Sequence, residues 1–448
     1  MRLSLGSDCS SYRLKTSINS VFEEPNHLME SLAAKDVPVR KNVYYLEGSV
    51  LLLSGIFVFL NPIPHTTAIK EICFYLIILL VVPLLLLKKI QFRFDSPFTV
   101  PLALFILWSA ASVLWAVDRP NTLHDIYAHL LKQAVIYFVV INLFNTEKKL
   151  ALLAWIVILS VSIFAVQGMF FHFIVMGKPW GSRLIPDAPI NASAIVNLFA
   201  FLLALHFLMR APKKTVKVLL TFCLLVTLAT IILSYSRAAM LALIASSLTM
   251  LLCMAQQRRK LIALMVLSAI VVALIYYIPS QHKQKSRILP ERFLQKNLRI
   301  GIYLTSLEIF KDYPLTGVGY GGQTFKRLWK TYHPKIPTEW QLNQLKPASS
   351  PHSFFFDILV RLGIVGMALF AFLIIKTLQI QIFVIQTKDT DLGGWGSCLL
   401  SALVGTLIGG FFGDILSGPP WLNIFLLLAM TTIIWQLAKE KRNNTTTV

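Results

Sequence analysis

The sequence predicts an all-α, polytopic membrane protein with about 12 transmembrane helices and a helical periplasmic segment between spans 9 and 10. Three observations predict this fold class. The chain has 448 residues, 56% of them hydrophobic and 14% charged, and a mean hydropathy of +0.67. Soluble domains carry about 25% charged residues, so this composition indicates an integral membrane protein. Long apolar stretches recur along the chain, and basic residues concentrate in alternate connections between them.

Twelve apolar stretches are long enough to cross a membrane. They cover residues 43–60, 69–87, 98–115, 124–143, 149–175, 189–209, 215–233, 238–255, 260–278, 353–375, 395–415 and 420–438. The first 42 residues are polar and contain no apolar core of a signal sequence, so we expect no cleaved signal peptide.

Basic residues in the short connections predict the orientation, because cytoplasmic loops carry an excess of Lys and Arg. Alternate connections contain basic clusters at 88–93, 148–149, 210–217 and 258–260, and the tail adds three more basic residues at 439–442. Both termini are therefore expected in the cytoplasm. The domain prediction is a cytoplasmic segment 1–42, helices 1–9 over 43–278, a periplasmic segment 279–351, helices 10–12 over 352–438, and a cytoplasmic tail 439–448.

The segment 279–351 is unusually basic for the outer side of a membrane. It holds twelve Lys and Arg against four acidic residues, a net charge of +8. An anionic lipid or a phosphorylated substrate is the simplest reason for this charge, and nucleic acid is not expected there. Within the segment, an interfacial helix is expected from Pro290 to Pro314, and a second short helix from Gln323 to Tyr332.

The sequence supports neither a dinucleotide-binding loop nor a metal site. Residues 317–322 match the glycine spacing of a dinucleotide-binding loop, but that interpretation requires a preceding strand and a βαβ unit, so a tight turn or backbone nest is the better one. None of the five cysteines is expected to form a disulfide, and no Cys/His cluster has metal-ligand spacing. No metal and no cofactor are predicted.

His352 lies where the polar segment meets the tenth apolar stretch. Ser350 as a helix cap and Pro351 at the first helical position would place it at the positive end of a helix dipole. That dipole disfavours the protonated imidazole, and a neutral imidazole can accept a proton from a hydroxyl. His352 is therefore a candidate general base. A purely structural residue at the start of a helix is the alternative.

Arg237 and Arg299 map to the same outer surface as His352, and two arginines beside a base would suit displacement of a phosphate-linked group by a hydroxyl. The alternatives are a snorkelling helix anchor for Arg237 and a charge facing lipid headgroups for Arg299. Arg183 and Asn191 could line the same cavity, or they could belong to a structural loop.

Other polar residues inside the spans are less specific. Asp357 and Arg361, at i and i+4, favour an intrahelical ion pair with a structural role. Asp414, near the outer end of the eleventh span, is compatible with either a structural or a functional role. The remaining polar positions could line a cavity without being diagnostic: Asp125, His129 and Lys132.

Two short motifs carry a resemblance to a known family. Arg237 and Leu241 form an Arg-x3-Leu motif, and His352 and Gly363 form a His-x10-Gly motif. With the sequence Tyr-Pro-Leu-Thr-Gly-Val-Gly at 313–319 and the large outer segment before span 10, the chain resembles the WaaL-type O-antigen ligases of the O-antigen ligase/polymerase superfamily. This resemblance covers nearly the whole chain.

The resemblance implies an inner-membrane glycosyltransferase of a Gram-negative bacterium, with its active site facing the periplasm, that acts in lipopolysaccharide biosynthesis. It would transfer O-antigen glycan from undecaprenyl pyrophosphate to a sugar hydroxyl of lipid A–core oligosaccharide, with inversion and without a metal. His352 would be the general base, and Arg237 and Arg299 would bind the pyrophosphate. O-antigen polymerases and protein O-oligosaccharyltransferases share this donor and remain alternatives. A transporter of lipid-linked glycan is a weaker alternative, because the two halves show no clear internal repeat.

Overall fold

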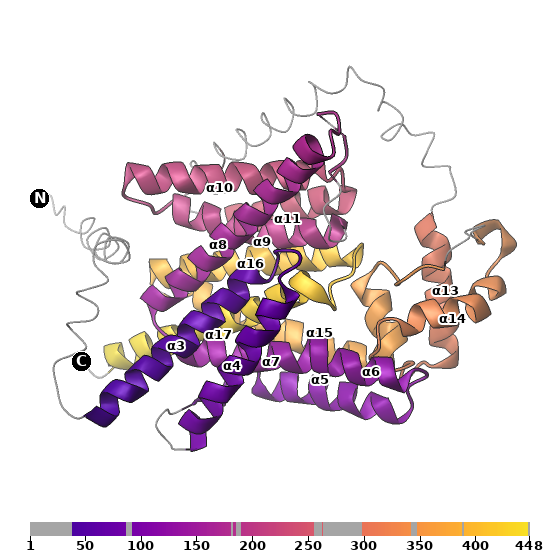
Figure 1. The fold of residues 1–448 in the computed structure, drawn as a ribbon, viewed down its shortest axis with the longest axis horizontal. Coiled ribbons are helices and arrows are strands. Elements are labelled where there is room, and N and C mark those ends of the chain that lie inside the picture. Colours follow the sequence, from indigo (N-terminus) through magenta and orange to yellow (C-terminus); the bar gives the residue numbers. More distant parts are fainter. Residues whose placement is uncertain are drawn as a thin grey trace, which may run out of the picture.

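The computed structural model describes residues 38–86, 92–180, 182–184, 190–254, 262, 298–341, 347–387 and 389–446. Across these residues all regular structure is helical and no strand occurs, which confirms the predicted all-α class. Figure 1 shows the helices running mostly along the long axis of the molecule.

The helices coincide with eleven of the twelve expected spans, and span 260–278, apart from residue 262, lies outside the described residues. Seven helices are long and apolar enough to cross a membrane, and four further apolar helices are shorter. The count of twelve therefore stays a prediction. The helices are α3 (Pro38–Leu60), α4 (Thr67–Leu86), α5 (Thr99–Ala111), α6 (Arg119–Asp125), α7 (Lys132–Leu143), α8 (Glu147–Phe170), α9 (Ile190–Leu208), α10 (Lys214–Leu233), α11 (Arg237–Cys253), α15 (Phe354–Ile385), α16 (Thr390–Phe411) and α17 (Gly418–Thr446).

Helices α16 and α17 form the centre of the bundle. Their most apolar windows are 72% and 83% buried, compared with 28% for α4, which is peripheral. Helix α16 packs against α9, α11, α15 and α17. Its glycines allow this close contact: a Cβ at Gly405 would lie 2.6 Å from the Leu198 side chain, and one at Gly409 would lie 2.9 Å from Ile195.

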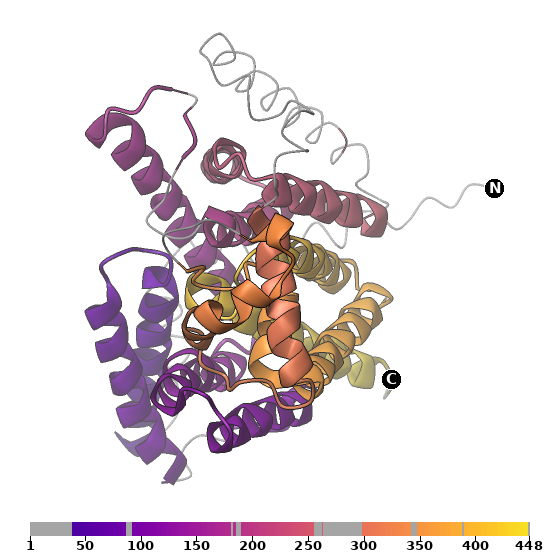
Figure 2. The same cartoon turned by 90° about the vertical axis from the view of Figure 1, so that its right-hand side faces the viewer.

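Two short helices cover one end of the bundle, which we call the capped end. Helix α13 (Leu298–Asp312) runs crosswise to the long helices, and α14 (Thr324–Tyr332) packs beside it (Figures 1 and 2). The 3-10 turns η8 (His333–Lys335) and η9 (Thr338–Trp340) follow. Helix α14 begins one residue after the predicted start. The expected beginning of the interfacial helix, before residue 298, lies outside the described residues.

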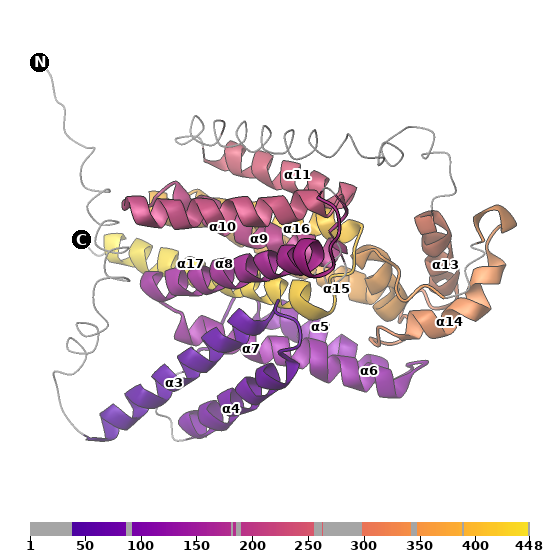
Figure 3. The same ribbon diagram turned by 45° about the horizontal axis from the view of Figure 1, so that its top comes forward.

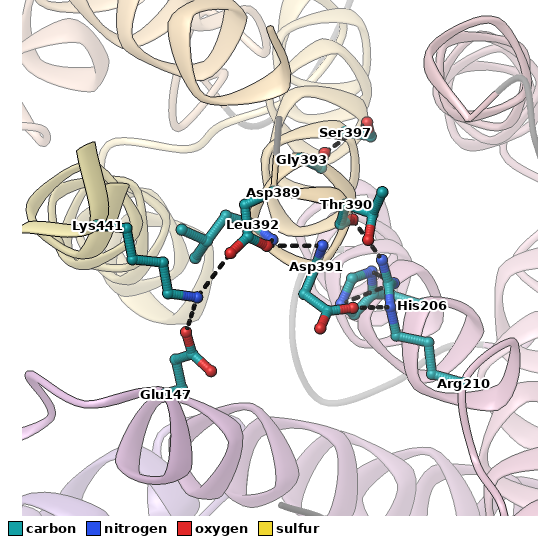
Figure 4. Close-up of polar contacts among 10 residues, drawn as sticks. All are labelled: Glu147, His206, Arg210, Asp389, Thr390, Asp391, Leu392, Gly393, Ser397 and Lys441. Atoms are coloured by element: carbon teal, nitrogen blue, oxygen red, sulfur yellow. Dashed lines mark hydrogen bonds and ion pairs between the residues drawn. The ribbon is translucent and has the colours of Figure 1, made fainter. Parts of the chain in front are cut away.

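The opposite end of the bundle gathers several of the basic connections that the sequence places on one side of the membrane. Lys441 of α17 bonds Asp389 at 2.7 Å and Glu147 at 2.5 Å (Figure 4). Arg210 lies 3.7 Å from Asp391 at the start of α16. These connections therefore share the end away from α13 and α14, as alternating crossings require.

Candidate functional site

His352 lies at the capped end, just before α15. The helix starts at Phe354 with Ser353 as its N-cap residue, so the expected cap at Ser350 and first helical position at Pro351 are wrong. His352 instead adopts a left-handed backbone conformation with φ of 52°. Such a conformation is uncommon for a residue with a Cβ and is enriched at functional sites. It turns the chain out of the polar segment and into the helix.

The imidazole of His352 is held by the segment that follows α16. Its Nδ1 lies 3.1 Å from Oδ2 of Asp414, and its side chain is 41% exposed while that of Asp414 is 22% exposed. The Ser350 hydroxyl donates to the same carboxylate oxygen at 2.8 Å. Asp414 Oδ1 is buried without a hydrogen-bond partner among the described residues. The carboxylate thus fixes a ring that stays open to solvent.

Electrostatics favour a charged carboxylate at Asp414. Burial acts to raise its pKa, but the hydrogen bonds from His352 and Ser350, together with the charge interactions with His352 and Arg361, outweigh burial and leave the pKa below its ordinary value. A carboxylate can only accept a hydrogen bond, so the proton on the neutral ring lies on Nδ1. The lone pair of Nε2 is then available to take a proton, and the Asp414 charge stabilises the imidazolium that results.

Arg299 contacts the same segment. It lies in the first turn of α13, and its Nη1 donates to the carbonyl of Phe412 at 2.9 Å. Phe412 is two residues before Asp414, so one short stretch of chain contacts both Arg299 and His352. Tyr303, one turn further along α13, stacks on Phe356 of α15 with ring centroids 4.8 Å apart. This contact joins α13 to the first turn of the helix that follows His352.

Arg237 is the first residue of α11, and its side chain is exposed. The Ser236 hydroxyl caps the helix by accepting from the amide of Ala239 at 3.2 Å. Helix α11 packs along α16, where a Cβ on Gly409 would lie 3.6 Å from the Ala242 side chain. Since Gly409 lies near the end of α16 and Ala242 near the start of α11, Arg237 belongs to the same end of the bundle as Phe412 and Asp414.

Of the two further candidates, Arg183 and Asn191, the structure describes the side chain of Arg183 alone. Arg183 donates through Nε to the carbonyl of Ser234 at 3.0 Å, and the amide of Leu184 donates to Leu233 at 2.8 Å. Arg183 therefore braces the turn that leads into Arg237. Asn191 lies in the first turn of α9, but its side chain is outside the described part of the chain.

Gly363, the second residue of the His-x10-Gly motif, has a structural role. It interrupts α15 with φ of 67°, and a Cβ there would lie 2.3 Å from the carbonyl oxygen of Leu315. The interruption frees helix carbonyls, which accept from neighbours: Val360 from the Val318 amide at 2.9 Å, and Leu362 from the Trp108 indole at 3.0 Å. The motif therefore contains both the candidate base, His352, and the kink at Gly363, against which residues 313–319 pack.

The glycine-rich turn at 317–322 is filled by the protein's own side chains. Its amides donate to side-chain oxygens of the α5–α6 region, with Gly322 bonding Asp125 at 2.7 Å and Gly321 bonding Thr122 at 3.3 Å. The predicted ion pair between Asp357 and Arg361 is present at 2.7 Å, and Arg361 also donates to the carbonyl of Tyr320. This cluster secures the capped end, and the amides of the turn already have acceptors within the protein.

Sequence reasoning did not assign Asp414 and Ser350 to the site. Asp414 is 62 residues after His352, and its only signal was an acidic residue near the outer end of the eleventh span. Among the described residues, no group of three His, Cys, Asp or Glu side chains could hold a metal ion.

Comparison with known protein families supports the resemblance seen in the motifs. Residues 222–371 match the family model described as O-antigen ligase. The match covers about a third of the chain and includes Arg237, Arg299, His352 and Gly363, whereas Asp414 lies beyond it. No curated protein matches the chain.

Proposed function

We propose that the chain, whose residues 222–371 match the family model described as O-antigen ligase, ligates O-antigen glycan from undecaprenyl pyrophosphate onto lipid A–core oligosaccharide. The membrane would be the inner membrane of a Gram-negative bacterium, with the capped end in the periplasm. The contact of His352 with Asp414, beside an arginine held on the same segment, is the observation that carries this proposal.

The proposed reaction is a displacement at the anomeric carbon of the donor sugar. Nε2 of His352 takes the proton of the acceptor hydroxyl as its oxygen bonds to that carbon. The bond from the anomeric carbon to the pyrophosphate oxygen breaks, and its electron pair leaves with the pyrophosphate. Attack from the face opposite the leaving group inverts the anomeric centre.

Arg237 and Arg299 would stabilise the departing pyrophosphate. A guanidinium stays charged and presents a planar fork of donors that matches phosphate oxygens. Arg299 is already oriented by the Phe412 carbonyl, so less side-chain freedom is lost when it binds a ligand. With two such cations, the leaving group needs no metal ion to offset its charge.

The test is transfer of purified lipid-linked glycan to lipid A–core, in detergent and with a chelator present. His352→Ala should retain its fold and lose at least about 100-fold in transfer rate, the usual contribution of a general base. His65→Ala is the matched control, because His65 is also exposed and left-handed, with φ of 61°. It should transfer at the wild-type rate. A well-folded His352→Ala protein with near wild-type transfer would refute the base assignment, and loss of wild-type activity in chelator would refute the metal-free mechanism.

Replacing either arginine by alanine removes its charge, whereas replacing it by lysine keeps the charge and removes the planar guanidinium. Arg299→Ala and Arg237→Ala should weaken donor binding and slow transfer, and lysine should restore only part of either, since it lacks the bidentate fork. Equal activity of the lysine and arginine forms would argue against a shaped phosphate contact.

A gene deletion separates the ligase from its relatives. Loss of a ligase leaves lipid A–core without O-antigen, whereas loss of a polymerase leaves core carrying a single repeat unit. Lipopolysaccharide gels distinguish these patterns directly. Normal lipopolysaccharide together with unglycosylated proteins would instead indicate a protein O-oligosaccharyltransferase.

A further inference from the structure

The phenol of Tyr303 is a polar group at the capped end that the proposed reaction does not use. Tyr303 lies on α13, four residues after Arg299, so the two side chains share one face of the helix. Helix α13 packs on α15 at the capped end (Figure 3). The Tyr303 ring stacks on Phe356, in the first turn of α15, with ring centroids 4.8 Å apart. This stack therefore fixes the phenol between the helix that carries Arg299 and the helix that follows His352.

Further aromatic contacts hold the stack in place. Phe356 contacts Phe355 edge-on, with ring centroids 5.5 Å apart, and the Phe355 ring lies 6.2 Å from that of Phe411 at the end of α16. The rings thus connect α13, α15 and α16. A phenylalanine at position 303 could make the same stacking contact, so the packing of the ring does not account for the hydroxyl.

The hydroxyl oxygen of Tyr303 is buried and makes no hydrogen bond of ordinary geometry with the residues that the structure describes. A buried polar atom without a partner destabilises a folded protein, and native structures contain few such atoms. The fold therefore gains nothing from this hydroxyl, and its neighbours indicate what else it can do.

Two charged groups of the candidate site lie within electrostatic reach of the hydroxyl. Burial raises the pKa of Tyr303, the Arg299 guanidinium acts to lower it, and the Asp414 carboxylate acts to raise it further. A neutral phenol near a cation and an anion turns its oxygen lone pairs towards the cation and its proton towards the anion. The Tyr303 oxygen is thereby oriented to accept from an N–H of Arg299.

We propose that Tyr303 is a positioning residue that fixes the Arg299 guanidinium for the departing pyrophosphate. This inference rests on the proposed function. The Phe412 carbonyl accepts from Nη1 of Arg299 at 2.9 Å, and the Tyr303 hydroxyl accepts from a second N–H once the lipid-linked glycan is bound. A guanidinium has five N–H donors in one plane, so the others remain for phosphate oxygens. Because negative charge builds on the pyrophosphate as the glycosidic bond breaks, a guanidinium fixed in this way stabilises the transition state more than the bound substrate.

The test compares Tyr303→Phe with Tyr332→Phe, which loses a tyrosine hydroxyl from the neighbouring helix α14. The Tyr332 hydroxyl donates to Asp312 at 2.7 Å, so its removal should lower the melting temperature and leave transfer within about twofold of the wild type. Tyr303→Phe keeps the stack on Phe356, so its melting temperature should equal or exceed the wild-type value. Its kcat should nevertheless fall about 10-fold, with the KM for lipid-linked glycan changed by less than about twofold.

A double variant shows whether Tyr303 acts through Arg299. Lysine at position 299 lacks the planar fork, so Arg299→Lys should already remove what the hydroxyl contributes. Adding Tyr303→Phe to Arg299→Lys should then lower kcat by less than about twofold. A further loss of about 10-fold would overturn the inference. Wild-type transfer by Tyr303→Phe would overturn it too, and so would a loss of transfer that accompanies a lowered melting temperature.

Binding of undecaprenyl pyrophosphate, the leaving product, provides a measurement that does not depend on transfer. In phosphatidylcholine nanodiscs, Tyr303→Phe should bind this product about 10-fold more weakly than the wild type, and Tyr332→Phe should bind it as the wild type does. Equal affinity of Tyr303→Phe and the wild type would contradict the positioning role. If the wild type binds the product but transfers no glycan to lipid A–core, the proposed function fails. The difference in product affinity then still decides whether Tyr303 positions Arg299.

Discussion

At the scale of single residues, Asp414 is the positioning residue of the candidate site. It holds Nδ1 of His352 and would offset the charge that the ring gains during transfer. Asp414→Asn keeps the size and an acceptor oxygen but removes the charge. We expect transfer to fall about 100-fold while donor affinity stays unchanged. Transfer rates and donor binding on the same purified protein check this, and equal losses in both would instead indicate a disturbed fold.

The same carboxylate predicts how stability varies with pH. The pKa of Asp414 is lower in the folded protein than the ordinary value of about 3.9, so its contribution to stability is complete above that value. The contribution is lost as the pH falls through the lower, folded-state pKa. Thermal unfolding of the wild type and of Asp414→Asn should therefore differ at pH 6 and converge towards pH 3. A difference that widens with acidity would contradict the assigned direction.

The sequence pattern predicted His352 as a site residue but did not assign its partner Asp414 to the site. His352 and Arg299 stand out locally, as a base and a cation beside apolar stretches. Asp414 becomes part of the site only because the end of α16 lies beside the start of α15. A contact between residues 62 positions apart produces no recognisable spacing in the sequence. The helix start was misplaced for a similar reason: Ser350 suits a cap, but its hydroxyl bonds Asp414 instead.

At the scale of elements, the kink in α15 shows what apolar patterning can and cannot predict. The apolar run from residue 353 predicted a helix correctly, yet the run gives no sign of a break at Gly363. The break depends on a distant partner, because Leu315 and its neighbours occupy the space where a Cβ would lie. The helix also continues to Ile385, ten residues past the predicted end, where Gln381 bonds Thr431 of α17 at 3.1 Å.

Gly363→Ala should destabilise the protein because the added methyl group meets backbone atoms in a conformation that disfavours a Cβ. We expect a loss of at least about 1–3 kcal/mol in the free energy of unfolding. Gly168→Ala in α8 is the control, since a Cβ there meets nothing within 4 Å. It should be neutral or stabilising by up to about 1 kcal/mol. Melting temperatures of both variants in detergent test this, and similar values for the two would show that α15 tolerates a side chain at the kink.

At the scale of the whole molecule, the candidate site and the ion pairs of the basic connections lie at opposite ends of the bundle. The capped end holds His352, Asp414 and Arg299, and the other end ties helices together through Lys441 and Arg210 (Figure 4). Helix α16 reaches both ends, because it starts at Thr390 and ends at Phe411, just before Phe412. The alternation of basic connections predicts that these two ends lie on opposite sides of the membrane, because charge in short loops follows topology and needs no tertiary contact. The packing order of the helices depends on side-chain fit and was not predictable in the same way.

The division also predicts the side of the membrane on which each end lies. Lys214 starts α10, at the end that gathers the basic connections, and Trp340 ends η9 at the capped end. Between them, α10, α11 and the expected span 260–278 make three crossings, an odd number. Reporter fusions should therefore place residue 214 in the cytoplasm and residue 340 outside it, with a fusion after Lys441 matching residue 214. If residues 214 and 340 report the same side, then 260–278 does not cross the membrane, and the periplasmic assignment of the capped end fails with it.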